Sequence, residues 1–149
     1  MVQLKIELLL GDGGERLVFI HPNDNNKVIK VLKPGIKKHN FQNELEFKYY
    51  NFLINKNRDF SHITKCFGYI DTNFGKGLIF ERVVDFDGQD SKFLRNCLND
   101  NIFSEAQEKK LLEDLKSYLF KNEILFIDCS SQNVFCKKIS EDKYTLIIY

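Results

Sequence analysis

The stretch Ile124-Leu-Phe-Ile-Asp128-Cys-Ser-Ser-Gln-Asn133-Val-Phe-Cys136 joins two apolar runs through an acid, a four-residue polar loop and an amide. The first run has the composition of a short strand. Taken alone, an Asp and an Asn five positions apart are typical of any turn between two strands, because both residues favour turns. The meaning of this pair therefore depends on which other features the chain supplies, and in what order.

The bulk composition describes a globular domain. A chain of 149 residues is long enough to bury a core, and 43% hydrophobic with 29% charged residues is a soluble composition. The formal charge is +1, so no electrostatic case exists for nucleic acid or a membrane as the partner. The basic pairs Lys37-Lys38 and Lys137-Lys138 are interpreted as solvated faces.

The chain carries no sign of export. Its first seven residues alternate apolar and polar, unlike a signal peptide, and no stretch is long enough to span a bilayer. Its four cysteines are scattered and form no Cys-x-x-Cys motif, which indicates free thiols and a cytoplasmic location. These cysteines are Cys66, Cys97, Cys129 and Cys136.

The first half of the chain predicts five strands and one helix. The strands are expected at residues 4–10, 16–21, 27–32, 64–70 and 77–84. Between the third and fourth, apolar residues recur at helical spacing over residues 40–55, which predicts a helix. Its apolar positions are Phe41, Leu45, Tyr49, Phe52 and Leu53.

The second half predicts helices followed by short strands. A short helix is expected over residues 91–98, and Ser104 with Gln107 fits a capping box that starts a longer one. That helix should end at Asn122 in a left-handed conformation. Strands are expected at residues 124–127, 134–138 and 144–149. The long helix presents one apolar face, formed by Leu111, Leu112, Leu115, Tyr118 and Leu119.

This order of elements is α+β, and it matches the two-lobed plan of protein kinases. The match predicts an N-lobe with a five-stranded antiparallel sheet and one helix over residues 1–84, a hinge over 85–90, and a partial helical C-lobe over 91–149. Runs of strands followed by helices also describe many other α+β domains. The hypothesis therefore depends on individual residues.

The first two predicted strands enclose Gly11-Asp-Gly13-Gly14-Glu-Arg-Leu-Val18. A kinase glycine loop, G-x-G-x-x-G-x-V, occupies this position and lets backbone amides approach phosphate oxygens. Gly11, Gly13 and Val18 align with it, and Gly14 adds to the glycine content. Arg16 replaces the third glycine. A plain hairpin turn is the alternative.

Val28-Ile-Lys30 matches the V-A-I-K strand, whose lysine grips the α- and β-phosphates and pairs with a helix glutamate. Glu46 is the predicted partner, with Glu44 as the alternative. A lysine between apolar neighbours needs such a partner, because an unpaired buried charge is costly. The competing interpretation is an outward-facing lysine on an alternating strand.

In a kinase catalytic loop, the Asp accepts the proton of the attacking hydroxyl and the Asn five positions on binds magnesium. Asp128 would then be the base or hydroxyl-orienting group, and Asn133 the metal ligand. Phe126 and Ile127 stand where kinases have His-Arg, and Ser130 replaces a common lysine.

Several other motifs are assigned structural roles. Asp85-Phe-Asp-Gly88 precedes the catalytic loop, so it cannot be the magnesium-binding D-F-G and is interpreted as a capped turn. The histidines show no metal spacing and are interpreted as surface residues. They are His21, His39 and His62.

From Gly11 to its end, the chain resembles the bacterial YrbL family, the PhoP-regulatory-network proteins of the kinase-like superfamily. The residues that carry the resemblance are Gly11-x-Gly13 with Arg16 and His21-Pro22, Ile29-Lys30, Glu44 to Tyr50, Asp85-Phe-Asp-Gly88 and Ser131-Gln-Asn-Val-Phe-Cys136. The resemblance implies a kinase-like fold. It supports this fold more than it supports phosphotransfer.

The chain departs from kinases at its end. The strand after the catalytic loop normally leads to an Asp that binds magnesium, and here the sequence stops at Tyr149. The expectation is a truncated kinase: a fragment, a shortened gene product, or a protein that does not transfer phosphate.

These residues are compatible with three functions. The preferred one is a nucleotide-binding or regulatory module, a pseudokinase with weak or no phosphotransfer. The second is an active ATP-dependent phosphotransferase acting on a protein or small-molecule hydroxyl, and the third is an unrelated α+β interaction domain. The expected cofactors are ATP and Mg²⁺, and a protein partner is expected to cover the incomplete C-lobe.

Overall fold

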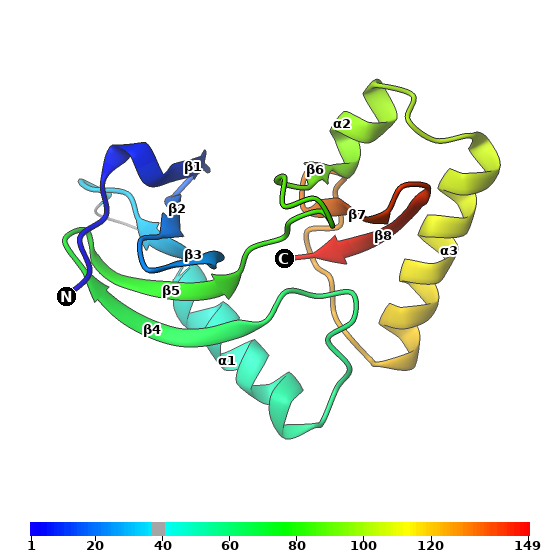
Figure 1. Ribbon diagram of the computed structural model, residues 1–149. Helices are drawn as coiled ribbons and strands as arrows, with labels where there is room; N and C mark the ends of the chain where they lie inside the picture. The colour runs from blue at the N-terminus through cyan, green and yellow to red at the C-terminus, as the bar shows by residue number, and fades with distance from the viewer. Residues whose placement is uncertain (37–40) are drawn as a thin grey trace. The chain divides into compact units, whose positions relative to one another are not determined.

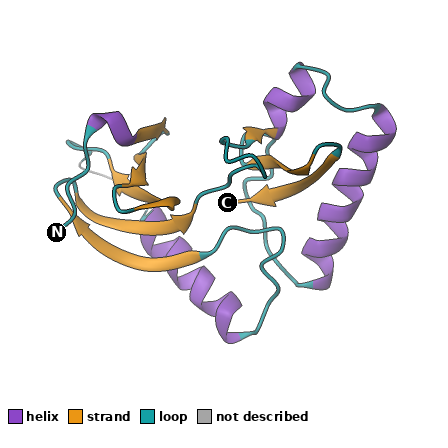
Figure 2. Cartoon of the chain, viewed as in Figure 1, coloured by secondary structure: helices purple, strands orange, loops and turns teal. Residues whose placement is uncertain are grey.

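The computed structural model describes residues 1–36 and 41–149. Within them the chain is α+β, with helices and antiparallel strands (Figures 1 and 2). The elements are η1 (Ile6–Leu8), β1 (Leu9–Asp12), β2 (Arg16–His21), β3 (Asp24–Leu32), α1 (Gln42–Asn55), β4 (Cys66–Thr72), β5 (Gly75–Glu81), β6 (Lys92–Phe93), α2 (Leu94–Asn99), α3 (Glu105–Lys121), β7 (Val134–Ser140) and β8 (Lys143–Ile148).

The chain divides into two compact units. Unit 1 comprises Met1–Asn57 and Lys65–Arg82, and unit 2 comprises Arg58–Thr64 and Val83–Tyr149. The segment Arg58–Thr64 belongs to unit 2 because it pairs with β8: the Thr64 amide donates to the Ile148 carbonyl at 3.0 Å, and the Ile148 amide donates to the His62 carbonyl at 2.9 Å. Each unit has its own sheet.

The sheet of unit 1 has five antiparallel strands in the order β1-β2-β3-β5-β4 among the described residues. Its central strand, β3, is the most buried. Side chains alternate between the two faces of a strand. Ile29 and Val31 therefore lie on one face, in a core with Leu4 and Phe19, and Lys30 lies on the other.

The face that carries Lys30 is covered by α1 (Figure 1). The ring of Tyr50 meets that of Phe80 in β5 edge-on at 5.3 Å, and Phe47 packs against Tyr69 in β4 at 4.8 Å. Leu53 is fully buried. Aromatic contacts of this kind fix both the position and the rotation of a helix on a sheet.

The rotation of α1 differs from the prediction. The predicted apolar face is largely exposed: Phe41, Leu45 and Phe52 are 59%, 61% and 48% exposed. Leu53 is buried as predicted, and the other buried residue is Tyr50, which the prediction did not include. The helix carries two neighbouring rows of apolar side chains. Its contacts with the sheet decide which row is buried, and the sequence does not show those contacts.

In unit 2, β6, β7 and β8 form a three-stranded antiparallel sheet in that order. The long helix α3 buries Leu115 and Tyr118. The Tyr118 hydroxyl donates to the Asp59 carbonyl at 2.5 Å, and the His62 ring packs on Tyr118 at 4.8 Å. Because His62 Nδ1 also lies 2.8 Å from the Leu146 carbonyl, its interpretation as a surface residue is wrong.

The long helix α3 begins where the sequence predicts. The Ser104 side chain accepts from the Gln107 amide, and the Gln107 side chain accepts from the Ser104 amide, so the capping box is confirmed. Its end differs from the prediction: Asn122 has φ −96°, and the left-handed residue is Glu123, at φ 52°. Of the predicted apolar face, Leu112 is 50% exposed.

Of two further predicted strands, one begins later than predicted and the other does not form. Residues 4–10 form a 3-10 turn followed by the start of β1, and residues 124–127 form no strand. Ile127 is 93% exposed, because this apolar run has no strand beside it to pair with. Three predictions lie outside the described residues: the solvated face at Lys37-Lys38, the surface position of His39, and the helix start at residue 40.

Candidate functional site

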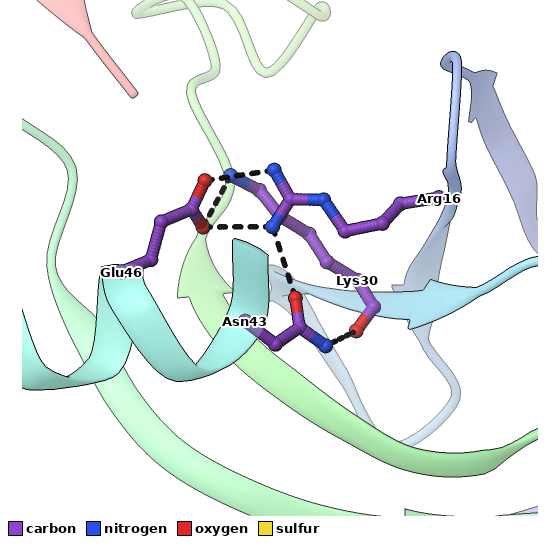
Figure 3. A network of polar contacts seen from close by, with 4 residues as sticks. All are labelled: Arg16, Lys30, Asn43 and Glu46. Atoms are coloured by element: carbon purple, nitrogen blue, oxygen red, sulfur yellow. Dashed lines mark hydrogen bonds and ion pairs between the residues drawn. The ribbon is translucent and has the colours of Figure 1, made fainter. Parts of the chain in front are cut away.

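The side chain of Lys30 projects from the middle of β3 towards α1 (Figure 3). It is 2% exposed, and its Nζ lies 4.0 Å from the centre of the Phe80 ring and 3.4 Å from Glu46 Oε2. The predicted pairing of Lys30 with Glu46 is therefore confirmed, and the alternative, Glu44, lies exposed on the helix. A buried ammonium group on the central strand is the most unusual feature of unit 1.

Arg16 is a third member of this cluster. Its Nη2 donates to Glu46 Oε1 at 2.7 Å, and its Nη1 donates to Glu46 Oε2 at 2.9 Å, so the guanidinium grips the carboxylate with two parallel bonds (Figure 3). Such bidentate pairs are the strong ones among charged hydrogen bonds. Nη1 also donates to Asn43 Oδ1, and Asn43 Nδ2 donates to the Lys30 carbonyl. The cluster thus ties β2, β3 and α1 together.

The electrostatics of the cluster are set by burial and by its two cations. Desolvation lowers the pKa of Lys30 to about 8, against the attraction of Glu46 and with the help of the like charge on Arg16. Burial alone would raise the pKa of Glu46, but Lys30 and Arg16 outweigh it and hold that pKa below its ordinary value. The carboxylate is therefore ionised at neutral pH.

The strand register aligns further predicted residues with Lys30. Val18 in β2 lies opposite Lys30 in β3, and Gly11 in β1 lies opposite Val18. The Gly13 amide donates to the Arg16 carbonyl at 3.0 Å, so the hairpin itself uses this amide. A Cβ on Gly14 would meet nothing within 4 Å. The turn has the geometry of an ordinary hairpin, and a phosphate-binding role for Gly11, Gly13, Gly14 and Val18 stays a prediction.

The other predicted pair, Asp128 and Asn133, lies in the loop before β7 in unit 2. The loop closes on itself: Asn133 Nδ2 donates to the Asp128 carbonyl at 3.1 Å, and the Ser130 amide donates to the same oxygen at 2.8 Å. Asn133 Oδ1 accepts no bond from the described part of the chain, so an oxygen ligand for a cation is available there. The Asp128 side chain is exposed. The roles of both residues stay predictions.

The motif Asp85-Phe-Asp-Gly88 is a turn, as predicted. The Gly88 amide donates to the Asp85 carbonyl, with Gly88 at φ +84°, and the Gln89 amide donates to Asp87 Oδ1. Asp85 Oδ1 also accepts from the Ser91 hydroxyl at 2.5 Å and from the Lys138 amide at 2.8 Å. These bonds attach the turn to β7, which accounts for its residues without any metal.

Three further properties of the described residues concern metals, membranes and thiols. They contain no group of three or more His, Cys, Asp and Glu side chains that could hold a metal ion. None of their helices combines the length and the apolar character needed to cross a membrane. All four cysteines are free thiols, with Cys97 and Cys136 buried, as the sequence indicated.

The structure adds two residues that the sequence did not assign to the site. Arg16 was recognised only as a departure from the glycine pattern, and Asn43 was not considered. A signal for Asn43 does exist, since it precedes Glu46 by three residues and so shares its helix face. No local signal shows that Arg16 reaches α1.

Comparison with known proteins gives a consistent match over the whole chain. Residues 2–149 match the family model described as PhoP regulatory network protein YrbL. The chain is 31% identical over 150 residues to a protein of Escherichia coli K12 named uncharacterized protein YrbL, covering 99% of this chain and 71% of the relative. A Shigella flexneri protein of the same name matches equally. The chain therefore belongs to the family of the PhoP regulatory network protein YrbL.

Proposed function

We propose that the chain is a regulatory module of kinase-like fold that binds ATP and transfers phosphate weakly or not at all. Lys30, held by Glu46, is the residue that contacts the phosphates, and Asn133 is a magnesium ligand. The regulatory role extends to this chain what the family's description says of its members.

The observation that carries the proposal is the burial of Lys30. An ammonium group on a central strand costs folding free energy, and Val or Ile at this position would pack without that cost. Lys30 is nevertheless 2% exposed, with a carboxylate and an aromatic ring arranged around its Nζ. A costly group in an ordered setting is typical of a ligand site.

The proposal favours binding over catalysis because of Asp128. A catalytic base is usually oriented by a second group. The exposed Asp128 side chain makes no hydrogen bond or ion pair with any other described residue. Ile127, next to it, is almost fully exposed.

Thermal unfolding with and without ATP and Mg²⁺ tests the proposal. A ligand that binds the folded state alone stabilises it by RT ln(1 + [L]/Kd), or about 2.7 kcal/mol at a concentration of 100 Kd. The rise in unfolding temperature should be lost in Lys30→Ala. It should be kept in the control Lys33→Ala, because Lys33 pairs with Asp12 near the surface. An unrelated interaction domain would show no shift with the wild type, and that result would refute the proposal.

An active phosphotransferase is the second candidate, and the arrangement of Asn133 favours it. The Asn133 amide nitrogen closes the loop and leaves its oxygen for a cation, as a magnesium ligand requires. ATP turnover that disappears in Asp128→Asn, with nucleotide binding unchanged, would select this candidate. Binding without turnover in the wild type would select the module.

A further inference from the structure

Two N–H groups of the Arg16 side chain form no hydrogen bond with the described residues. A guanidinium group carries five N–H donors in a fixed planar arrangement. In Arg16, one N–H of Nη2 and one of Nη1 bond to Glu46, and Nη1 bonds also to Asn43. The Nε–H and the outer N–H of Nη2 donate to no described residue. These two lie along one edge of the group and form a second fork, and the side chain is 15% exposed.

The charge of the cluster points to the kind of ligand. Lys30 and Glu46 alone form a neutral pair, which attracts no anion. With Arg16 the cluster has one excess positive charge when Lys30 is protonated. A planar fork of two N–H groups fits two oxygens of a phosphate group, and arginine is preferred where phosphate is bound in this bidentate way.

The backbone of the hairpin between β1 and β2 gives a second reason to expect a phosphate contact from a side chain. In a glycine loop the amides provide the phosphate contacts, but here the Gly13 amide is used by the hairpin. Arg16 occupies the position of the third glycine and places a side-chain cation beside Lys30. Hydrogen bonds to Glu46 and Asn43 of α1 fix the orientation of the Arg16 guanidinium (Figure 3).

We propose that Arg16 is a phosphate-binding residue, whose outer fork takes over the work of the glycine-loop amides and makes the site selective for polyanionic ligands such as nucleoside di- and triphosphates. This inference rests on the proposed phosphate site at Lys30. It adds the ligand class, because the contribution of Arg16 grows with the number of negative charges on the ligand.

The test is a calorimetric titration of wild type and Arg16→Gln with AMP, ADP, ATP and inorganic tripolyphosphate. Arg16→Gln should weaken ATP and tripolyphosphate by about tenfold or more and AMP by much less, since each lost charge contact costs more against a more highly charged ligand. Arg16→Lys should regain part of the affinity for ATP. Arg95→Gln, an exposed arginine of unit 2, is the matched control and should behave as wild type.

The ligand series separates Arg16 as a ligand from Arg16 as a clamp on α1. If it only holds the helix, AMP, ADP and ATP should weaken by the same factor, and this result would overturn the inference while leaving the nucleotide site intact. Tripolyphosphate binding that depends on Arg16, without any ATP binding, would keep the inference and refute the nucleotide function. Wild type that binds none of the four ligands would refute both.

Discussion

The two groups of predicted site residues differ in how firmly the protein holds them. Around Lys30 in unit 1, three charged side chains and an amide from β2, β3 and α1 are joined by hydrogen bonds, and Lys30 is buried. Around Asp128 in unit 2, one side-chain bond from Asn133 closes a surface loop, and the carboxylate projects into solvent.

This difference supports the proposal that the protein binds a ligand rather than catalyses a reaction. Binding an anion needs a fixed cation, and unit 1 provides one together with its counter-ion. Catalysis needs a base held to within a fraction of an ångström, and the Asp128 side chain has no such support among the described residues. The contrast predicts that mutations in the two places have different costs.

The largest effect on stability should come from Glu46→Gln. The change leaves Lys30 and Arg16 as like charges without a counter-ion. Breaking a fully buried pair costs roughly 3–5 kcal/mol. Because Glu46 is 28% exposed, we expect a loss of about 2 kcal/mol in the free energy of unfolding, measured by urea denaturation.

Glu44→Gln is the matched control for this change, two residues earlier on the exposed side of the same helix. It should cost less than about 0.5 kcal/mol. Equal losses in the two variants would show that the Glu46 cluster is no more tightly integrated than an ordinary surface.

The pH dependence of stability should show an effect of similar size. The pKa of Lys30 is about 8 in the folded protein and 10.5 in the unfolded chain, so between these values the unfolded chain binds more protons and stability rises with pH. Relative to Lys30→Met, the wild type should gain about 2 kcal/mol between pH 7 and 9.5.

This comparison uses denaturant unfolding of both proteins at each pH. The charged or titrating neighbours Glu46, Arg16 and Cys66 are present in both, so the difference isolates the lysine. A constant difference across the range would show that the Lys30 ammonium is hydrated, contrary to its burial.

In unit 2, a moderate effect should come from the cap of α3. Ser104→Ala removes the acceptor for the Gln107 amide and should lower the free energy of unfolding by about 1 kcal/mol. Helix content in circular dichroism should follow the same transition. A loss below about 0.2 kcal/mol would mean that the helix end is held by other contacts.

The smallest effect should come from Asp128→Asn. An exposed carboxylate that has no hydrogen-bond or ion-pair partner among the described residues is expected to contribute within about 0.5 kcal/mol of zero. Ser104→Ala then serves as the positive control for unit 2. A loss above about 1 kcal/mol in Asp128→Asn would reveal a structural role for this loop and remove the contrast between the two regions.

The pairing of Lys30 with Glu46 could be predicted from the sequence because two periodicities determine it. Alternation along β3 places the Lys30 side chain on the other face of the sheet from Ile29. Helical spacing places Glu46 one turn before Tyr50 and two turns before Leu53, and both of these residues are buried. Capping of α3 was predictable for the same reason, since Ser104 and Gln107 interact locally. In each case the signal lies within one element.

Other features depend on contacts between elements and could not be derived. The grip of Arg16 on Glu46 joins residues 30 positions apart, and nothing near Arg16 indicates it. The choice between two apolar stripes on α1 depends on Phe80 and Tyr69. The apolar run at residues 124–127 has the composition of a strand, but it lacks a neighbour to pair with, which the sequence cannot show.

The most direct test of the proposed ATP site is a titration of ¹⁵N-labelled protein with ATP and Mg²⁺, followed by amide chemical shifts. The amides of Val18, Lys30 and Glu46 should shift together and saturably, and Lys30→Ala should abolish these shifts. Shifts that avoid β2, β3 and α1, or none at ATP concentrations in the millimolar range, would contradict the proposed site.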